Sequence, residues 1–151
     1  MSLNEEVELL QNIPLFSKIA PSKLKLLAFT SDRLTFAPGQ ELFHQGDPGD
    51  AAYIIMDGEA DVTVDTPAGE VSVAKVRKND LIGEIAILCD VPRTATIKAL
   101  SEVTTLAITK ELFFQLVTEF PEMAVEIMRE LAHRLERTTQ QLREAISDRA
   151  D

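Results

Sequence analysis

Short apolar runs between residues 33 and 109 place the strongest constraint on what this chain can fold into. Within these runs the apolar residues fall largely on alternate positions, which is the pattern of strands that bury one face. Turn-forming sequences separate the runs, among them Pro38-Gly39, Asp57-Gly58 and Lys78-Asn79-Asp80. Strands of about five residues, with a turn about every eight to twelve residues, predict a sandwich or a jelly-roll barrel.

Helical periodicity replaces the strand pattern on both sides of this region. Helices are expected over residues 5–11, 22–29, 110–118 and 122–146. Pro21 is well placed to open the second of them and Thr109 to cap the third, and Phe120-Pro121 separates the last two. Residues 147–151 are expected to fray.

The predicted fold class is therefore mainly β with flanking α. A jelly-roll barrel (a double-stranded β-helix) is expected over about residues 31–109, with N-terminal helices before it. C-terminal helices are expected over about residues 110–146, the last of them long. The 151 residues are expected to form a single domain.

The composition excludes several classes of protein. Cys89 is the only cysteine, which excludes an intramolecular disulfide and a cysteine-rich metal or iron–sulfur site. The two histidines, His44 and His133, lie far apart without a ligand-like spacing, which argues against a metal-dependent enzyme of the cupin type. We therefore expect a protein that is not an enzyme and that holds no metal or other cofactor.

Charge and hydropathy bear on the partners and the compartment. A formal net charge of −10 opposes binding to the phosphate backbone of nucleic acids, so any anion site has to be built locally. No apolar run is long enough for a transmembrane helix, and the N-terminus lacks the pattern of a secretory signal. The expectation is a cytoplasmic protein with no membrane partner and no nucleic-acid partner.

The last predicted helix carries a second apolar pattern. Its members are spaced alternately by four and three residues over about three heptads. They are Ala124, Met128, Leu131, Leu135, Thr138, Leu142 and Ala145. A seam of this kind predicts a homodimer formed through this helix, with Thr138 as a polar member that needs a reason. The alternative is a helix that packs the same stripe against its own barrel.

The stretch from Leu81 to Leu100 holds the residues best suited to bind a ligand. A helical turn beginning at Glu84 would point free backbone N–H groups at an anion, which Gly83 would allow to approach closely. Arg93 offers a planar fork of donors that matches two phosphate oxygens, and Glu84 would accept hydrogen bonds from neighbouring hydroxyl groups. The alternatives are a salt bridge from Arg93 to a carboxylate such as Asp90, and a Glu84 that only complements a helix N-terminus.

This stretch resembles the phosphate-binding cassette of the cyclic nucleotide-binding domain family. The family pattern is roughly Phe-Gly-Glu-(Leu/Ile)-Ala, a gap, then Pro-Arg-(Ala/Ser/Thr)-Ala-Thr-Val. This sequence reads Ile82-Gly83-Glu84-Ile85-Ala86, then Pro92-Arg93-Thr94-Ala95-Thr96-Ile97. Upstream, PGQELFHQGDPGDAAYIIMDGEADV (residues 38–62) resembles the strand-turn-strand signature of the same family. The resemblance covers about residues 13–142, with both motifs in the family's order and spacing.

The resemblance implies roles for eight residues. Arg93 is implied to pair with the exocyclic oxygens of the cyclic phosphate, and Glu84 to accept the ribose 2′-hydroxyl. Thr94 is implied to add a hydroxyl near the phosphate. The residues implied to lie against ribose and phosphate are Gly83, Ile85 and Ala86. Thr138-Thr139 matches a Thr-Ser pair that reaches the adenine in the catabolite-activator branch, where one hydroxyl comes from the partner subunit. Alternatively, both threonines are solvated helix hydroxyls.

The implied function is a bacterial cyclic nucleotide-binding regulatory module that couples its ligand to a movement of the C-terminal helix. Thr138-Thr139 favours cAMP, whereas Thr94 after the cassette arginine also resembles members that prefer cGMP. The alternative is a domain of the same fold that dimerises and senses no nucleotide. Ile82 and Asn79 depart from the family's Phe and Gly, with little effect expected, since Asn tolerates the left-handed conformation.

The activator branch continues into a helix-turn-helix DNA-binding domain, whereas this sequence stops at Asp151. No transcription-factor activity is therefore expected of this chain. It is expected to be either a stand-alone sensor or a piece of a larger protein.

Overall fold

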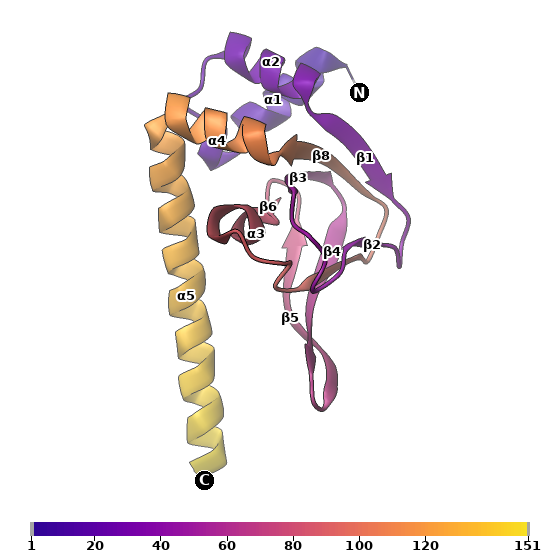
Figure 1. The fold of residues 1–151 in the computed structure, drawn as a ribbon, viewed down its shortest axis with the longest axis vertical. Coiled ribbons are helices and arrows are strands. Elements are labelled where there is room, and N and C mark those ends of the chain that lie inside the picture. Colours follow the sequence, from indigo (N-terminus) through magenta and orange to yellow (C-terminus); the bar gives the residue numbers. More distant parts are fainter. Residues whose placement is uncertain (1, 151) are drawn as a thin grey trace.

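The computed structural model describes residues 2–150, and the side chains of all of these except 14, 149 and 150. The chain begins with α1 (Leu3–Gln11), η1 (Pro14–Phe16) and α2 (Pro21–Thr30). The strands are β1 (Asp32–Phe36), β2 (Glu41–Phe43), β3 (Ala51–Asp57), β4 (Glu59–Thr66), β5 (Gly69–Arg77), β6 (Leu81–Ile82), β7 (Thr96–Ala99) and β8 (Val103–Thr109). The remaining helices are α3 (Glu84–Cys89), between β6 and β7, then α4 (Lys110–Glu119) and α5 (Pro121–Ala150). Figure 1 shows α1, α2 and α4 together at one end of the strands, with α5 running along their side.

The strands form two four-stranded antiparallel sheets. The first sheet has the order β1-β8-β3-β6 and the second has the order β2-β7-β4-β5. The prediction of a mainly β fold with flanking helices is confirmed. Among the described residues no strand belongs to both sheets, so the structure shows two packed sheets and not a closed barrel. The edge strands β2 and β6 contain only three and two residues.

Strand β3 of the first sheet is buried on both faces, and it therefore departs from simple alternation. Ala52, Ile54 and Met56 belong to a core cluster shared with the helices. Ile55, between them in sequence, belongs to a second cluster with residues of the other sheet, such as Val76 and Ile97. A strand covered on both sides is expected to be apolar almost throughout.

The helices pack as one group against the outer face of the first sheet. Leu10, Phe16 and Leu24 from the N-terminal segments share a core cluster with Phe113 of α4 and Ile127 of α5. Thr109 caps α4 as predicted, because its hydroxyl accepts a hydrogen bond from Leu112 N at 3.2 Å. The first two turns of α5 are thereby fixed to the domain, and the rest of the helix extends past α3.

Helix α5 is longer than predicted. It continues to Ala150, so the predicted end at Ile146 and the frayed tail are wrong for residues 147–150, which contain no helix breaker. Asp151 lies outside the described residues. None of the described helices, α5 included, has the length and apolarity needed to cross a membrane.

Helix α5 carries two apolar stripes, where the sequence analysis predicted one seam. Met123 and Ile127 are buried against the domain, and Leu131 packs on the same cluster. The other stripe is exposed along its whole length and is called the α5 stripe below. It consists of Val125, Met128, Ala132, Leu135, Thr139, Leu142 and Ile146. The predicted seam mixed the two, because a seven-residue repeat can be drawn on either of two neighbouring lines along a helix.

Candidate functional site

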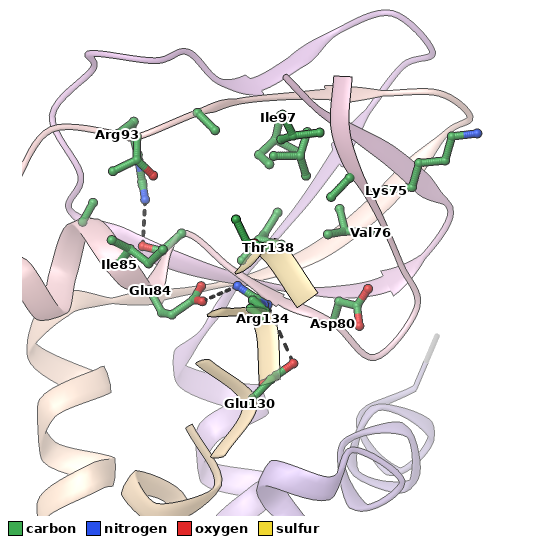
Figure 2. Close-up of a pocket in the computed structure, with 18 of the residues that line it drawn as sticks. Lys75, Val76, Asp80, Glu84, Ile85, Arg93, Ile97, Glu130, Arg134 and Thr138 are labelled. Carbon is green, nitrogen blue, oxygen red and sulfur yellow. Dashed lines mark hydrogen bonds and ion pairs between the residues drawn. The ribbon is translucent and has the colours of Figure 1, made fainter. Parts of the chain in front are cut away.

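A cavity of about 670 Å³ lies between the second sheet, α3 and α5. Its volume is typical of a site for a small organic ligand. The predicted site residues that line it are Gly83, Glu84, Ile85, Ala86, Arg93, Thr94 and Thr138. Thr139 is not among the lining residues, and it belongs to the α5 stripe. Figure 2 shows Arg93 and Glu84 at separate points of the wall, with Arg134 and Thr138 approaching from α5.

Arg93 is a buried cation that forms no salt bridge with a carboxylate in the described part of the chain. Only 3% of its surface is exposed. Its Nη1 donates to Gly83 O at 3.0 Å and its Nη2 to Ala51 O at 2.7 Å. Its Nε is buried and has no hydrogen-bond partner in the described part of the chain. Asp90, the carboxylate considered as its partner, lies instead 3.4 Å from Lys110 Nζ.

The two Nη groups of Arg93 thus donate to neutral carbonyl oxygens, and the charges of Asp50, Asp47 and Glu84 act on the guanidinium without forming a salt bridge among the described residues. Burial lowers the pKa of its guanidinium, but arginine remains protonated at neutral pH. A buried charge normally needs an opposite charge nearby. The arrangement suits an anion supplied by a ligand in the cavity.

Gly83 forms the turn that brings β6 into α3. Its φ is +83°, a conformation that glycine adopts without strain and that other residues adopt only at a cost in free energy. A Cβ at this position would lie 2.6 Å from Arg93 Nη1. Glycine is thus required both by the turn and by the close approach of the guanidinium. Asn79, just before β6, also has a positive φ, +79°, as its tolerance of that conformation predicted.

Glu84 is the second buried charge of the cavity, with 3% of its surface exposed. Burial raises the pKa of its carboxyl, and the charge of Arg134 acts in the opposite direction. Arg134 Nη1 donates to Glu84 Oε1 at 2.7 Å, and Arg134 Nη2 donates to Leu81 O at 3.2 Å. Glu130, one turn earlier on α5, lies 3.7 Å from Arg134 Nη2. These contacts join α5 directly to the start of α3 (Figure 2).

Helix α5 forms a substantial part of the cavity wall. It contributes Glu130, Arg134, Arg137, Thr138 and Gln141. Strand β5 contributes the residues across from them, 73–77. One end of the cavity therefore holds Arg93, and the helix and β5 supply mostly polar side chains to the rest. Among the described side chains, no group of three or more His, Cys, Asp or Glu could hold a metal ion.

Two residues of the site escaped the sequence analysis. Arg134 is separated from Glu84 by fifty residues, and its helical position shows nothing of that pairing. Phe43, which also lines the cavity, lies in the strand signature and was given no role. The only signal for Arg134 was its place one turn before Thr138 on the same face of the helix.

Comparisons with known proteins identify the fold and its family. A family model described as a cyclic nucleotide-binding domain matches residues 33–120. A CRP-like cAMP-activated global transcriptional regulator of Mycobacterium tuberculosis is 28% identical over 140 residues, covering 92% of this chain and 62% of the regulator. This chain thus spans less than two thirds of that relative's length.

Solved structures give the same result. The catabolite activator protein of Thermus thermophilus is 28% identical with a TM-score of 0.76, covering 85% of this chain and 61% of that one. The regulatory subunit of a cAMP-independent protein kinase A from Trypanosoma brucei is 25% identical with a TM-score of 0.75, covering 87% of this chain and 47% of that one. The chain therefore belongs to the cyclic nucleotide-binding domain family, as its cassette and strand signature indicated.

Proposed function

We propose that this chain is a sensor module that binds cAMP in the cavity and transmits binding to helix α5. The observation that carries the proposal is the buried guanidinium of Arg93, which lines the cavity and forms no salt bridge among the described residues. A cyclic phosphate would supply the missing negative charge. Charge-assisted hydrogen bonds from arginine to phosphate are among the strongest that proteins make.

The ribose is proposed to lie beside Glu84. An ionised carboxylate accepts hydrogen bonds, so Glu84 Oε2 or Oε1 would accept a hydrogen bond from the 2′-hydroxyl. Arg134 already donates to Oε1 at 2.7 Å, so the hydroxyl would join an existing pair. Thr94, which also lines the cavity, would add a hydroxyl near the phosphate.

Movement of α5 is the proposed output. The helix is attached to the domain through Met123 and Ile127 at its start and through Arg134 at the cavity. A ligand that touches both Glu84 and Thr138 would favour the helix position in which both contacts form. Binding would then shift an equilibrium between helix positions by its difference in affinity for them.

A homodimer through α5 is part of the proposal. The α5 stripe keeps the spacing of a two-stranded coiled coil and is exposed, with Leu135 67% and Met128 61% accessible. Thr138 faces the cavity of its own chain, whereas Thr139 lies on the stripe. In a dimer, Thr138 of one chain and Thr139 of the other would therefore be the pair that meets the base.

The choice of base rests on weaker grounds than the phosphate site. Paired threonines on α5 support cAMP, and the mycobacterial relative is by its name cAMP-activated. cGMP is the second candidate, because Thr94 offers a hydroxyl to a guanine amino group. The kinase subunit of Trypanosoma brucei, described as cAMP-independent, shows that the fold alone does not decide the ligand.

The proposal also includes a regulatory rather than enzymatic role in a bacterial cytoplasm, with no resident cofactor. The acidic net charge of −10 supports a chain that does not itself bind nucleic acid.

The direct test is calorimetric titration with cAMP and cGMP of protein freed of co-purified nucleotide by unfolding and refolding. Noncyclic 5′-AMP serves as control, because its phosphate carries a second charge and no ring. Tighter binding of cAMP than of cGMP and AMP is expected. Tighter binding of cGMP would replace the proposed ligand. Failure of both cyclic nucleotides to bind folded protein would leave a structural or dimerisation domain and end the sensor proposal.

A further inference from the structure

The guanidinium of Arg93 lies against aromatic rings that are far from it in sequence. Its central carbon is 4.1 Å from the ring centroid of Phe43, at the end of β2. It is 5.8 Å from the ring centroid of Tyr53, on β3. The two rings are themselves 5.9 Å apart with planes inclined by 30°. Both distances are within the range in which a cation is attracted to the electron-rich face of a ring.

The backbone completes the enclosure of this side chain. Gly83 O and Ala51 O accept its Nη hydrogens at 3.0 and 2.7 Å. Gly49 borders the Nε side, where an added Cβ would lie 3.4 Å from Nε. Two carbonyls therefore hold the Nη groups of the guanidinium, and its central carbon lies over the Phe43 ring.

The same segment that carries Phe43 also holds the main chain of Arg93. Gly46 N donates to Arg93 O at 2.9 Å, and Arg93 N donates to Asp47 O at 2.8 Å. Phe43 precedes this reciprocal pair by a few residues. The end of β2 and the loop after it thus hold both the backbone and the charged group of an arginine about fifty positions away in sequence.

We infer that Phe43 is a positioning residue for the anion site: its ring holds the Arg93 guanidinium in the plane from which it meets the ligand's phosphate. The inference rests on the proposed function and goes beyond it, because it places part of the affinity for the anionic group in a strand outside the cassette. The competing interpretation is that Phe43 only packs against the core cluster that contains Phe36 and Leu42.

The two interpretations differ in what the ring has to be. Packing needs an apolar side chain of similar volume, which leucine provides. Holding a cation needs the negative face of an aromatic ring. A guanidinium released from that face would keep its charge but lose its fixed orientation, and binding would have to restore that orientation at an entropic cost.

The test compares binding of cAMP, or of cGMP if that proves to be the ligand, by calorimetry across matched variants. Phe43→Leu removes the ring, and Phe43→Tyr retains it. Replacement of Phe43 by pentafluorophenylalanine keeps its shape and reverses the polarity of its face. Phe36→Leu is the control, because Phe36 belongs to the core cluster against which Phe43 packs, whereas the described rings that lie near the Arg93 guanidinium are those of Phe43 and Tyr53. Thermal unfolding of each variant without ligand verifies folding.

The expected losses in binding affinity follow from the free energy that a partly desolvated cation–π contact contributes. Phe43→Leu and the fluorinated ring should weaken binding by roughly 3- to 30-fold, and Phe43→Tyr and Phe36→Leu by less than about 3-fold. In an Arg93→Gln background, titrated to millimolar ligand, Phe43→Leu should cause no further loss beyond about 2-fold. The fluorinated protein decides the question even if Phe43→Leu does not fold.

If the wild type binds, any of three results would overturn the inference alone. The first is an unchanged affinity in the fluorinated protein, and the second is a loss of affinity in Phe36→Leu equal to that in Phe43→Leu. The third is an undiminished effect of Phe43→Leu on affinity in the Arg93→Gln background. A wild-type protein that binds neither cyclic nucleotide would instead overturn the proposed function, and this inference with it.

Discussion

Glu84 and Arg134 form an ion pair of 2.7 Å between the first residue of α3 and the middle of α5. Glu84 is almost fully buried, and about a third of the Arg134 side chain is exposed. The pair is the polar link between the cavity and the helix proposed to move. Because Arg134 lies on α5, the position of this helix also affects the carboxylate that would accept the ribose hydroxyl.

Arg134→Met should destabilise the protein by about 1–3 kcal/mol, because it leaves the Glu84 carboxylate buried with less compensation. This loss is smaller than the loss expected for a fully buried pair, because Arg134 is partly exposed. Urea unfolding measures the loss. In Glu84→Gln protein the same Arg134→Met change should cost much less. Equal costs in the two backgrounds would show that the pair contributes nothing to stability.

Gly83→Ala should abolish tight binding of the nucleotide. The new methyl group would lie 2.6 Å from Arg93 Nη1 and displace the guanidinium. Gly69→Ala is the matched control, because Gly69 also has a positive φ, +113°, but a Cβ there would meet nothing within 4 Å. Both changes should cost about 1–2 kcal/mol of unfolding free energy through backbone strain. Only Gly83→Ala should lower affinity in titration calorimetry, so similar affinities for the two variants would contradict this geometry.

Binding should weaken in mildly acidic solution. Burial raises the pKa of Glu84 above its ordinary 4.5, and the ribose hydroxyl needs the ionised form. Affinity should therefore be full above the raised pKa and fall by about tenfold per pH unit below it, starting above pH 4.5. Calorimetry across this range tests the dependence, and Glu84→Gln should bind weakly at every pH. A wild-type affinity that is constant down to pH 4.5 would rule out an ionised Glu84 in binding.

The raised pKa of Glu84 also affects the stability of the fold, and here a lower pH is favourable rather than unfavourable. The folded state holds the Glu84 proton more tightly than the unfolded state does. The unfavourable contribution of this carboxyl is thus present above the raised pKa and fades as the pH falls through it towards 4.5. The pH profile of unfolding for Glu84→Gln should lack this component.

Leu135→Glu should convert a dimer to a monomer. It places a charge in the centre of the α5 stripe, where a second helix would bury it. Gln140→Glu adds the same charge at an exposed position of α5 outside the stripe and should leave the dimer intact. Sedimentation velocity at tens of micromolar protein compares the two. A wild type that sediments as a monomer at this concentration would contradict the proposed dimer.

Much of the site could be predicted from the sequence because local rules determine it. Gly83, Glu84 and Arg93 fall within one short stretch, and a turn, a helix start and a planar cation each have a recognisable residue type. The structure brings all three to one cavity. The position of α3 was also predicted closely, since the expected turn over residues 84–88 became Glu84–Cys89.

The remaining features depend on packing between distant segments. The pairing of Arg134 with Glu84 and the stacking of Phe43 on Arg93 follow from where α5 and β2 are placed, which no local pattern contains. The predicted α5 seam shares Met128, Leu135 and Leu142 with the exposed stripe, and its other members lie one position before those of the stripe. Which of two neighbouring apolar lines faces outward is decided by the docking of Met123 and Ile127 on the domain. The pairing of the strands into two sheets likewise joins segments far apart in sequence, and alternation alone left a sandwich and a jelly-roll barrel both open.

The central claim is that the buried guanidinium of Arg93, which forms no salt bridge among the described residues, binds a cyclic phosphate in this cavity. The most direct measurement is calorimetric titration of wild-type and Arg93→Lys protein with cAMP, and with cGMP in parallel. Lysine keeps a positive charge but cannot reproduce the planar fork that contacts Gly83 O and Ala51 O. The account predicts saturable one-to-one binding per chain in the wild type and a loss of at least about tenfold in Arg93→Lys. Equal affinities in the two proteins, or no binding by folded wild type, would contradict it.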